Sequence, residues 1–288
     1  MNRQVLIKEL ELHAAKSRRN VVRMVEASDH GHLGGALSSM DIVTALYFYK
    51  MKVDPQNPTW ADRDRFLLSA GHKCMVQYAV LAERGYFDKS VLDTYGGLKT
   101  LLPGHPDMHK LPGVEANTGA LGHGLSIACG MAMGLRMDGK DAMVYTIMGD
   151  GELAEGSNWE AAAVAAHHKL DNLVVFVDFN GLQISGKVQD VMNFTPVAEH
   201  FAAFGWAVTD IDGNNMEEVV DTLDRLPLEK GKPNLIVAHT VKGKGLSFAE
   251  NVAAYHYWTP GAEELQQAIR ETEAQIEKLD AEWRALCK

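Results

Sequence analysis

The chain has 288 residues, of which 46% are hydrophobic and 23% charged, a composition that rules out wholesale disorder. Its 28 Lys and Arg residues against 38 Asp and Glu residues give a net charge of −10, which argues against nucleic acid or an anionic membrane as the main partner. Cys74, Cys129 and Cys287 show no CxxC spacing, which excludes a disulfide framework and a thiolate zinc site. With no secretory signal and no apolar run long enough to span a bilayer, we expect a cytoplasmic protein.

The amino-terminal part predicts two helices separated by a glycine-rich turn. Apolar residues recur among charged ones over 5–25, the pattern of an amphipathic helix. The turn His-Gly-His-Leu-Gly-Gly follows at 30–35. A second helix is predicted over 38–49, with Ser38 or Ser39 as its N-cap.

Short apolar runs of strand length come next. They lie at 65–69, 142–148, 173–178 and 235–239. The last three are almost continuously apolar, which is typical of strands buried on both faces of a parallel sheet. Helical stretches separate them at 122–137, 157–168 and 216–226. We therefore predict an α/β fold, a mostly parallel sheet flanked by helices on both faces, over 1–261, with a C-terminal helical extension over 262–288.

Glycines, carboxylates, an amide and histidines follow these runs, where the strands are expected to end. The first run leads into Gly71-His72, the second into 149–156, the third into Asn180 and the fourth into 240–245. Ligands of open parallel sheets bind beyond the carboxyl ends of the strands. We therefore expect one site at this edge. The basic stretch 242–245 lacks the order and spacing of a phosphate-binding P-loop, so we expect it to be a mobile loop that closes over the cofactor.

The segment Gly-Asp-Gly-Glu-Leu-Ala at 149–154 fits a loose form of the dinucleotide fingerprint. A carboxylate between the glycines would repel a pyrophosphate unless a cation lay between them. Mg²⁺ accepts carboxylate, amide and phosphate oxygens together, so Asp150 and Asn180 are candidate metal ligands. The alternative is that Asp150 caps the following helix and that Asn180 forms a tight turn with Gly181.

Gly-Asp-Gly followed at this distance by Asn resembles the thiamine diphosphate motif. Further stretches resemble the amino-terminal part of transketolase, in the same order from about residue 5 to residue 260. They are Ser-Asp-His-Gly-His-Leu-Gly-Gly at 28–35, Phe-Leu-Leu-Ser-Ala-Gly-His at 66–72, Pro-Gly-His-Pro-Asp at 103–107 and Thr-Gly-Ala-Leu-Gly-His-Gly at 118–124. The resemblance implies a thiamine-diphosphate-binding fold, with 1–261 as its diphosphate domain.

The resemblance also implies a set of site residues. A divalent metal, Mg²⁺ or else Ca²⁺ or Mn²⁺, would be held by the side chains of Asp150 and Asn180 and by the carbonyl of Leu182. The implied residues for binding thiamine diphosphate are His72, Gly119, Ala120, Leu121, Gly149, Asp150, Gly151, Glu152, Asn180, Ile184 and His256. The implied catalytic residues are His32, His105, His72, His256 and Glu155.

The histidines carry the proton chemistry in this interpretation, because a loop histidine can donate, accept and exchange protons near neutral pH. His32, His72 and His105 each stand beside a glycine. His256 is followed by Tyr257, where the family usually has Gly. Glu155 matches a family carboxylate that pairs with a carboxylate of the partner subunit. Structural or surface roles are expected for His13, His109, His167, His168 and His200.

In transketolases a second domain supplies the acid that acts on the aminopyrimidine, an aromatic pocket and the residues that hold the sugar phosphate. We find no further apolar β/α pattern for it before Lys288. We therefore predict the amino-terminal subunit of a split transketolase, active with a separate carboxyl-terminal subunit in a symmetric hetero-oligomer, a heterotetramer. It would transfer a two-carbon ketol unit from a ketose to an aldose, with ordinary sugar phosphates, sulfosugars and branched sugars all open as substrates.

Other functions remain possible at this point. The alpha subunit of a 2-oxo acid dehydrogenase and deoxyxylulose-phosphate synthase share the Gly-Asp-Gly to Asn spacing, but they match the stretches at 30–35 and 103–106 less well. A dinucleotide-binding oxidoreductase is the next class. A regulatory fragment without activity is harder to reconcile with a full set of metal ligands.

Overall fold

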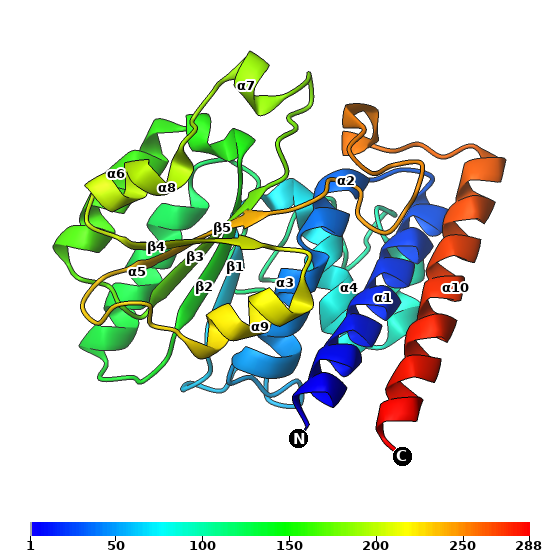
Figure 1. The fold of residues 1–288 in the computed structure, drawn as a ribbon, viewed down its shortest axis with the longest axis horizontal. Helices are drawn as coiled ribbons and strands as arrows, with labels where there is room; N and C mark the ends of the chain where they lie inside the picture. The colour runs from blue at the N-terminus through cyan, green and yellow to red at the C-terminus, as the bar shows by residue number, and fades with distance from the viewer. Residues whose placement is uncertain (1) are drawn as a thin grey trace.

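A computed structural model describes residues 2–288, and its centre is a five-stranded parallel sheet (Figure 1). The strands are β1 (Arg65–Leu68), β2 (Val144–Gly149), β3 (Leu173–Phe179), β4 (Ala207–Asp212) and β5 (Asn234–His239). They pair in the order β1-β2-β3-β5-β4, and each neighbouring pair is parallel. All four predicted strands are therefore confirmed.

The sheet is buried on both faces, as its apolar runs predict. Alternate residues of β2 and β3 enter two different hydrophobic clusters: Tyr145 and Phe176 pack in one, Val144 and Val175 in the other. Helices α5 (Gly124–Met137) and α6 (Gly156–His167) cover one face. The other face is covered by α1 (Arg3–Ser28), α3 (Met40–Ala45), α4 (Cys74–Arg84) and α9 (Met216–Asp224), as Figure 1 shows. The predicted α/β architecture is confirmed.

The sequence analysis did not predict strand β4, because its residues do not form a continuous apolar run. It lies at the edge of the sheet, and only Ala207 and Ile211 of its residues are buried, while the others, among them Thr209 and Asp210, are partly or fully exposed. An edge strand tolerates polar side chains, since its outer side meets solvent. Its position is set by pairing with β5.

The second helix is found near the predicted start, as α3 with Ser39 at its N-cap position, but the prediction misses a helix just before it. A helix α2 (Leu33–Ser38) begins inside the expected turn and is followed closely by α3 and by a π-helical turn over Leu46–Lys50. The side chain of Ser39 makes no capping hydrogen bond, although the residue stands at the N-cap position of α3. The hydroxyls of Ser38 and Ser39 donate to the carboxylate of Asp178, and each also donates to the carbonyl of Gly35. Two serines that resemble capping residues in the sequence are therefore buried partners of an acidic side chain.

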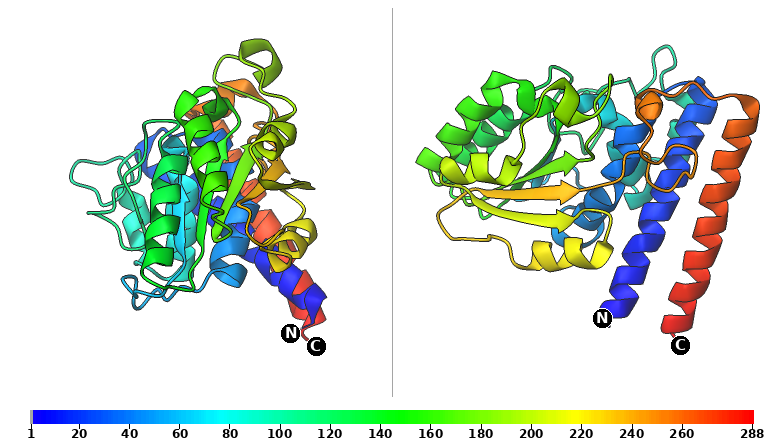
Figure 2. Two further views of the ribbon diagram at one scale, coloured as in Figure 1. Left: turned by 90° about the vertical axis from the view of Figure 1, so that its left-hand side faces the viewer. Right: turned by 45° about the horizontal axis from the view of Figure 1, so that its top comes forward.

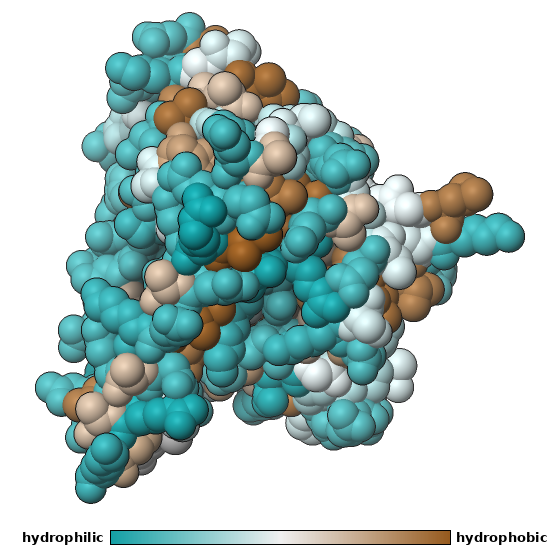
Figure 3. All heavy atoms as spheres, turned by 90° about the vertical axis from the view of Figure 1, so that its right-hand side faces the viewer, coloured by the Kyte–Doolittle hydropathy of each residue, from teal (hydrophilic) through white to brown (hydrophobic). Residues whose placement is uncertain are grey.

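The C-terminal helix α10 (Ala262–Leu286) is confirmed, and it packs along α1 in the opposite direction (Figures 1 and 2). Leu279 meets Leu12 and Ala15 of α1, and Lys8 forms an ion pair with Glu282 at 3.0 Å. Its outer face is polar, and the surface on this side is mainly hydrophilic with scattered apolar patches (Figure 3). The division of the chain at residue 261 stays a prediction.

Shorter elements complete the fold. They are 3-10 turns at Gly71–Lys73, Lys89–Thr94, Gly151–Ala154 and Ala253–His256, together with α7 (Val188–Val191) and α8 (Val197–Ala203). Over residues 2–288, we find no helix both long and apolar enough to cross a membrane.

Candidate active site

The loops after β1, β2, β3 and β5 surround a cavity of about 360 Å³ at the carboxyl edge of the sheet. Gly149 at the end of β2 pairs with Asp178 in β3, so the segments that follow these two strands lie next to each other. The predicted site residues that line this cavity are His32, His72, Gly119, Leu121, Gly149, Asp150, Gly151, Glu152, Asn180, Leu182, Ile184 and His256. The sheet topology thus brings together residues from distant parts of the chain.

Asp150 links the loops after β2 and β3. Its carboxylate accepts a hydrogen bond from Gly151 N at 2.8 Å and another from Gly181 N at 2.7 Å, and the residue is 4% exposed. Burial raises the pKa of Asp150 to about 6, against the opposing effect of the Lys73 ammonium. A cation bound beside this carboxylate would stabilise its ionised form.

The oxygen donors at this point fit a hard divalent cation. Asn180 is nearly buried, with its amide oxygen 3.2 Å from Leu182 N, and the Leu182 carbonyl already accepts a hydrogen bond from the ammonium of Lys242 at 2.8 Å. A carboxylate, an amide oxygen and a backbone carbonyl are ligands that Mg²⁺ accepts. No cluster of three or more His, Cys, Asp and Glu side chains suited to a metal occurs in the described part of the chain. The three candidate donors at this point, from Asp150, Asn180 and Leu182, are all oxygen atoms.

Glu152 fixes the loops around the cavity. Its carboxylate accepts hydrogen bonds from the Ser69 hydroxyl, from Gly122 N at 2.9 Å and from Gly149 N at 3.1 Å. The residue is 2% exposed, and burial raises its pKa. Because its oxygens face these three groups, Glu152 holds the segment before Gly122 in place against the β2 loop.

Histidines from separate segments cluster at the cavity. The ring centroid of His32 lies 5.3 Å from that of His72, 5.5 Å from that of His256 and 6.4 Å from that of His105. Burial lowers the pKa of His72 to about 2 and that of His256 to about 4, and it also lowers the pKa of His32. These imidazoles are therefore neutral near pH 7, and each can both donate and accept a hydrogen bond.

The tyrosine that replaces the usual glycine after His256 does not remove this histidine from the cavity. Tyr257 packs its ring 4.8 Å from that of His32, while His256 stacks on His72 with a centroid distance of 5.3 Å. The ammonium of Lys242 lies 3.1 Å from Nδ1 of His256. Since an ammonium only donates, Nδ1 accepts and the ring proton is assigned to Nε2.

Three predicted residues, His105, Ala120 and Glu155, do not line the cavity. His105 is exposed beside it, and a Cβ at Gly119 would lie 3.0 Å from Cδ2 of its ring. Ala120 and Glu155 are exposed as well. Their functional roles stay predictions.

The loop of His105 is held from behind by Tyr78. The tyrosine hydroxyl is shared between the carbonyl of Pro103 at 2.9 Å and the carbonyl of His105 at 3.0 Å. Tyr78 is fully buried in α4, so its ring cannot follow a movement of the loop. A buried helix residue thus fixes the backbone of an exposed histidine.

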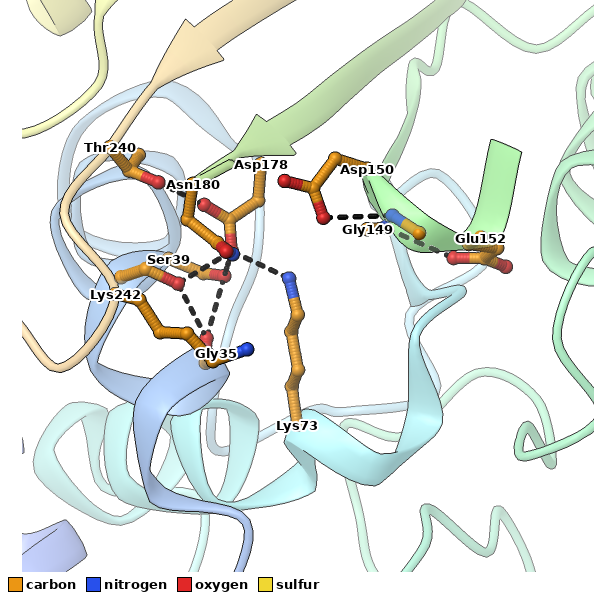
Figure 4. A network of polar contacts seen from close by, with 12 residues as sticks. Gly35, Ser39, Lys73, Gly149, Asp150, Glu152, Asp178, Asn180, Thr240 and Lys242 are labelled. Carbon is orange, nitrogen blue, oxygen red and sulfur yellow. Dashed lines mark hydrogen bonds and ion pairs between the residues drawn. The ribbon is translucent and has the colours of Figure 1, made fainter. Parts of the chain in front are cut away.

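A buried ion pair that the sequence analysis missed lies beside the candidate metal ligands Asp150 and Asn180 (Figure 4). Lys73 Nζ is 2.5 Å from Oδ2 of Asp178, and the two residues are 3% and 0% exposed. Although burial opposes ionisation, Lys73 and the hydroxyls of Ser38 and Thr240 hold the pKa of Asp178 below its ordinary value. A charged residue at the end of an otherwise apolar strand is the signal that could have found Asp178.

Lys242 is the second cation in the cavity. This residue of the predicted mobile loop is 2% exposed, whereas the side chain of Lys244 is 38% exposed, and the mobility of the loop stays a prediction. The backbone on either side is clamped: Asn214 Oδ1 accepts from Val241 N at 2.8 Å, and Arg18 Nε donates to the Lys244 carbonyl at 3.1 Å. These contacts direct Lys242 into the site.

The sequence matches the family described as "Transketolase, thiamine diphosphate binding domain" over residues 11–277. The chain belongs to the transketolase family. It is 44% identical over 276 residues to an apulose-4-phosphate transketolase subunit of Phocaeicola vulgatus, and the match covers 96% of this chain and 98% of that relative. It is also 44% identical over 243 residues to a 6-deoxy-6-sulfo-D-fructose transketolase subunit of Clostridium sp., covering 84% and 88%.

The fold agrees with solved transketolases. The structure of transketolase from Campylobacter jejuni superposes with a TM-score of 0.86 at 31% identity, over 99% of this chain and 48% of that one. This transketolase family chain thus spans about half the length of that solved transketolase. The family and the thiamine-diphosphate-binding α/β fold predicted from the sequence are confirmed, and the oxidoreductase alternative finds no support.

Proposed function

We propose that this chain is the amino-terminal subunit of a two-subunit transketolase. It would transfer a two-carbon ketol unit from a ketose or ketose phosphate to an aldose or aldose phosphate. The observation that carries the proposal is the match, along nearly their whole length, to relatives named as subunits of transketolases. The cavity at the carboxyl edge of the sheet supports it, since oxygen donors and neutral histidines meet there.

In this proposal Asp150, Asn180 and the Leu182 carbonyl hold a divalent cation, Mg²⁺ or else Ca²⁺ or Mn²⁺, that neutralises the diphosphate. Thiamine diphosphate, when bound, supplies the nucleophilic carbon needed to break and form carbon–carbon bonds. Gly151 lines the cavity, and a Cβ there would crowd the side chain of Gln183, which also lines it, at 3.1 Å. The chain's part is to bind and orient the diphosphate.

The histidines would act on the sugar. His32 lines the cavity and His105 lies beside it, with their rings 6.4 Å apart, and His72 and His256 complete the group. Because His32, His72 and His256 are neutral near pH 7, each can hold or move a proton at a hydroxyl or carbonyl oxygen of the substrate. Proton transfer by a positioned group contributes about 100- to 10,000-fold in rate.

The proposed partner is a separate carboxyl-terminal transketolase subunit that carries the pyrimidine-binding and C-terminal domains, in a symmetric hetero-oligomer. Glu155 supports this arrangement, because it is exposed. It lies next to Gly122: a Cβ added to Gly122 would be 2.3 Å from the Cβ of Glu155. A carboxylate so placed is available to a second chain. Neither nucleic acid nor a membrane is expected as a partner of a chain with net charge −10.

We place the protein in the cytoplasm on the basis of its thiols. Cys74, Cys129 and Cys287 are free, and Cys287 is exposed, which suits a reducing compartment.

The test is ketol transfer with and without the partner. The chain would be assayed alone and with the carboxyl-terminal subunit, in the presence of thiamine diphosphate and Mg²⁺. Donors should include a ketose phosphate, a sulfosugar and a branched ketose phosphate, because the two relatives are named for different sugars. Activity that requires both chains supports the proposal, and ketol transfer by this chain alone contradicts it. No ketol transfer with any donor in the assembled complex also contradicts it.

A further inference from the structure

Lys73 follows β1 and extends its side chain into the cavity. It is not one of the proposed metal ligands, which come from the loops after β2 and β3. Its side chain lines the cavity, with Nζ 3.7 Å from the position that a Cβ of Gly149 would take. Figure 4 shows the ammonium reaching toward the space between Asp178 and Asp150. A buried cation therefore lies next to the glycine that precedes the proposed metal-binding aspartate.

The ammonium is only partly satisfied by the protein. It carries three N–H donors, and the carboxylate of Asp178 is the one acceptor that the described residues offer it. That carboxylate is already surrounded, since it also accepts from the hydroxyls of Ser38, Ser39 and Thr240. A buried charge with donors left over is stabilised by an anion that enters the cavity.

The fold makes specific room for this side chain. A Cβ at Gly35 would lie 2.8 Å from Cε, 3.0 Å from Cγ and 3.1 Å from Cδ of Lys73. The stem of the lysine is therefore confined between α2 and the sheet, and the ammonium has little freedom to leave the cavity. A fixed cation binds an anion without the entropy loss of ordering a flexible side chain.

We propose that Lys73 is a further diphosphate-binding residue, which supplies part of the positive charge that the divalent cation otherwise provides. This inference rests on the proposed function, since it assumes that the cavity takes a diphosphate. If Lys73 has this role, the chain binds a diphosphate weakly without any metal. Loss of Lys73 then makes diphosphate binding more dependent on Mg²⁺.

The experiment measures binding by calorimetry, with inorganic pyrophosphate as the probe, first in EDTA and then in Mg²⁺. Lys73→Met removes the charge and keeps most of the stem. The double variant Lys73→Met with Asp178→Asn removes both charges, so that no unpaired carboxylate is left buried. Lys244→Met is the matched control, because it removes one lysine charge near the site without touching the cavity. Circular dichroism checks that each variant is folded.

In EDTA we expect the wild type to bind pyrophosphate and both Lys73 variants to bind at least tenfold more weakly, while Lys244→Met binds as the wild type does. In Mg²⁺ the loss should be smaller. Equal affinity of wild type and folded Lys73 variants in EDTA, or no metal-free binding by the wild type, overturns the role of Lys73. If the wild type binds neither pyrophosphate nor thiamine diphosphate even in Mg²⁺ and with the partner present, the proposed function itself fails.

Discussion

Gly35 and Lys73 fit against each other with no space for a methyl group between them. A Cβ added to Gly35 would lie 2.8 Å from Cε of Lys73 and so overlap the lysine stem. A Cβ added to the neighbouring Gly34 would likewise lie 2.8 Å from Cγ of Lys242. Two consecutive glycines of α2 thus accommodate the two buried lysines of the cavity. The glycine pair is needed here for its lack of side-chain volume.

Gly35→Ala should displace Lys73 from the cavity. The overlap at the lysine stem must be relieved by a shift, and overpacking of this kind costs about 1–3 kcal/mol in stability. Pyrophosphate binding should weaken with it. Urea unfolding and calorimetry measure the two effects. Gly134→Ala in α5 is the control, because nothing lies within 4 Å of its Cβ position, and it should be neutral or stabilising by up to about 1 kcal/mol. Equal behaviour of the two variants would contradict the packing argument.

Asp150→Ala should abolish cofactor binding and leave the fold intact. The change removes a carboxylate from the proposed metal site together with its hydrogen bond from Gly181 N, while Glu152 still accepts from Gly149 N and keeps the end of β2 in place. For the wild type in complex with its partner, thiamine diphosphate with Mg²⁺ at 100 times the dissociation constant should add about 2.7 kcal/mol of stability. Thermal unfolding with and without the ligands measures this gain. Asp150→Ala should show no gain in stability on adding the ligands. The control Asp141→Ala, at a fully exposed position, should show the same gain as the wild type.

Tyr78→Phe should loosen the loop that carries His105 without changing the binding of thiamine diphosphate. The loss of a hydroxyl shared by two carbonyls costs about 1 kcal/mol in stability. In the assembled enzyme we expect a lower kcat and an unchanged affinity for thiamine diphosphate. Tyr49→Phe, which removes a surface hydrogen bond to Asp224, is the comparison. An unchanged kcat in Tyr78→Phe would show that the loop keeps its place without the hydroxyl.

His72 should make the protein less stable in mild acid. Its pKa is about 2 in the folded chain, against about 6.5 for an unperturbed histidine. Below pH 6.5 the unfolded chain binds a proton that the folded chain does not, so stability falls as pH falls, by up to about 1.4 kcal/mol per pH unit. This window extends down toward the folded pKa.

His72→Asn removes this group and should flatten the dependence of stability on pH between pH 6.5 and 5. Urea unfolding at several pH values, without cofactor, measures the slope. His109→Asn, at an exposed position, is expected to keep the wild-type slope. A slope in His72→Asn as steep as in the wild type would mean that His72 is protonated in the folded chain.

Much of the fold follows from local pattern. The continuous apolar runs at β2, β3 and β5 predict strands buried on both faces, and a parallel sheet then brings their following loops to one edge. That is why Asp150 and Asn180 could be placed in one site from spacing alone. Strand β4 was missed because an edge strand carries no such signal.

Other parts of the site depend on contacts between distant segments. Ser38 and Ser39 resemble helix caps in the sequence, and only the approach of α2 to β3 makes them partners of Asp178. Lys73 and Lys242 resemble ordinary basic loop residues. Their burial is decided by the space that Gly34 and Gly35 leave.

Periodicity and short motifs were enough to predict the fold class, the transketolase family and the oxygen donors of the proposed metal site. They could not predict which charges face the cavity or which backbone groups hold them, and these were found only in the folded chain. The reason is physical: the charge state of a side chain depends on burial and on its neighbours, and most neighbours of Asp150, Asp178 and Lys242 come from remote segments.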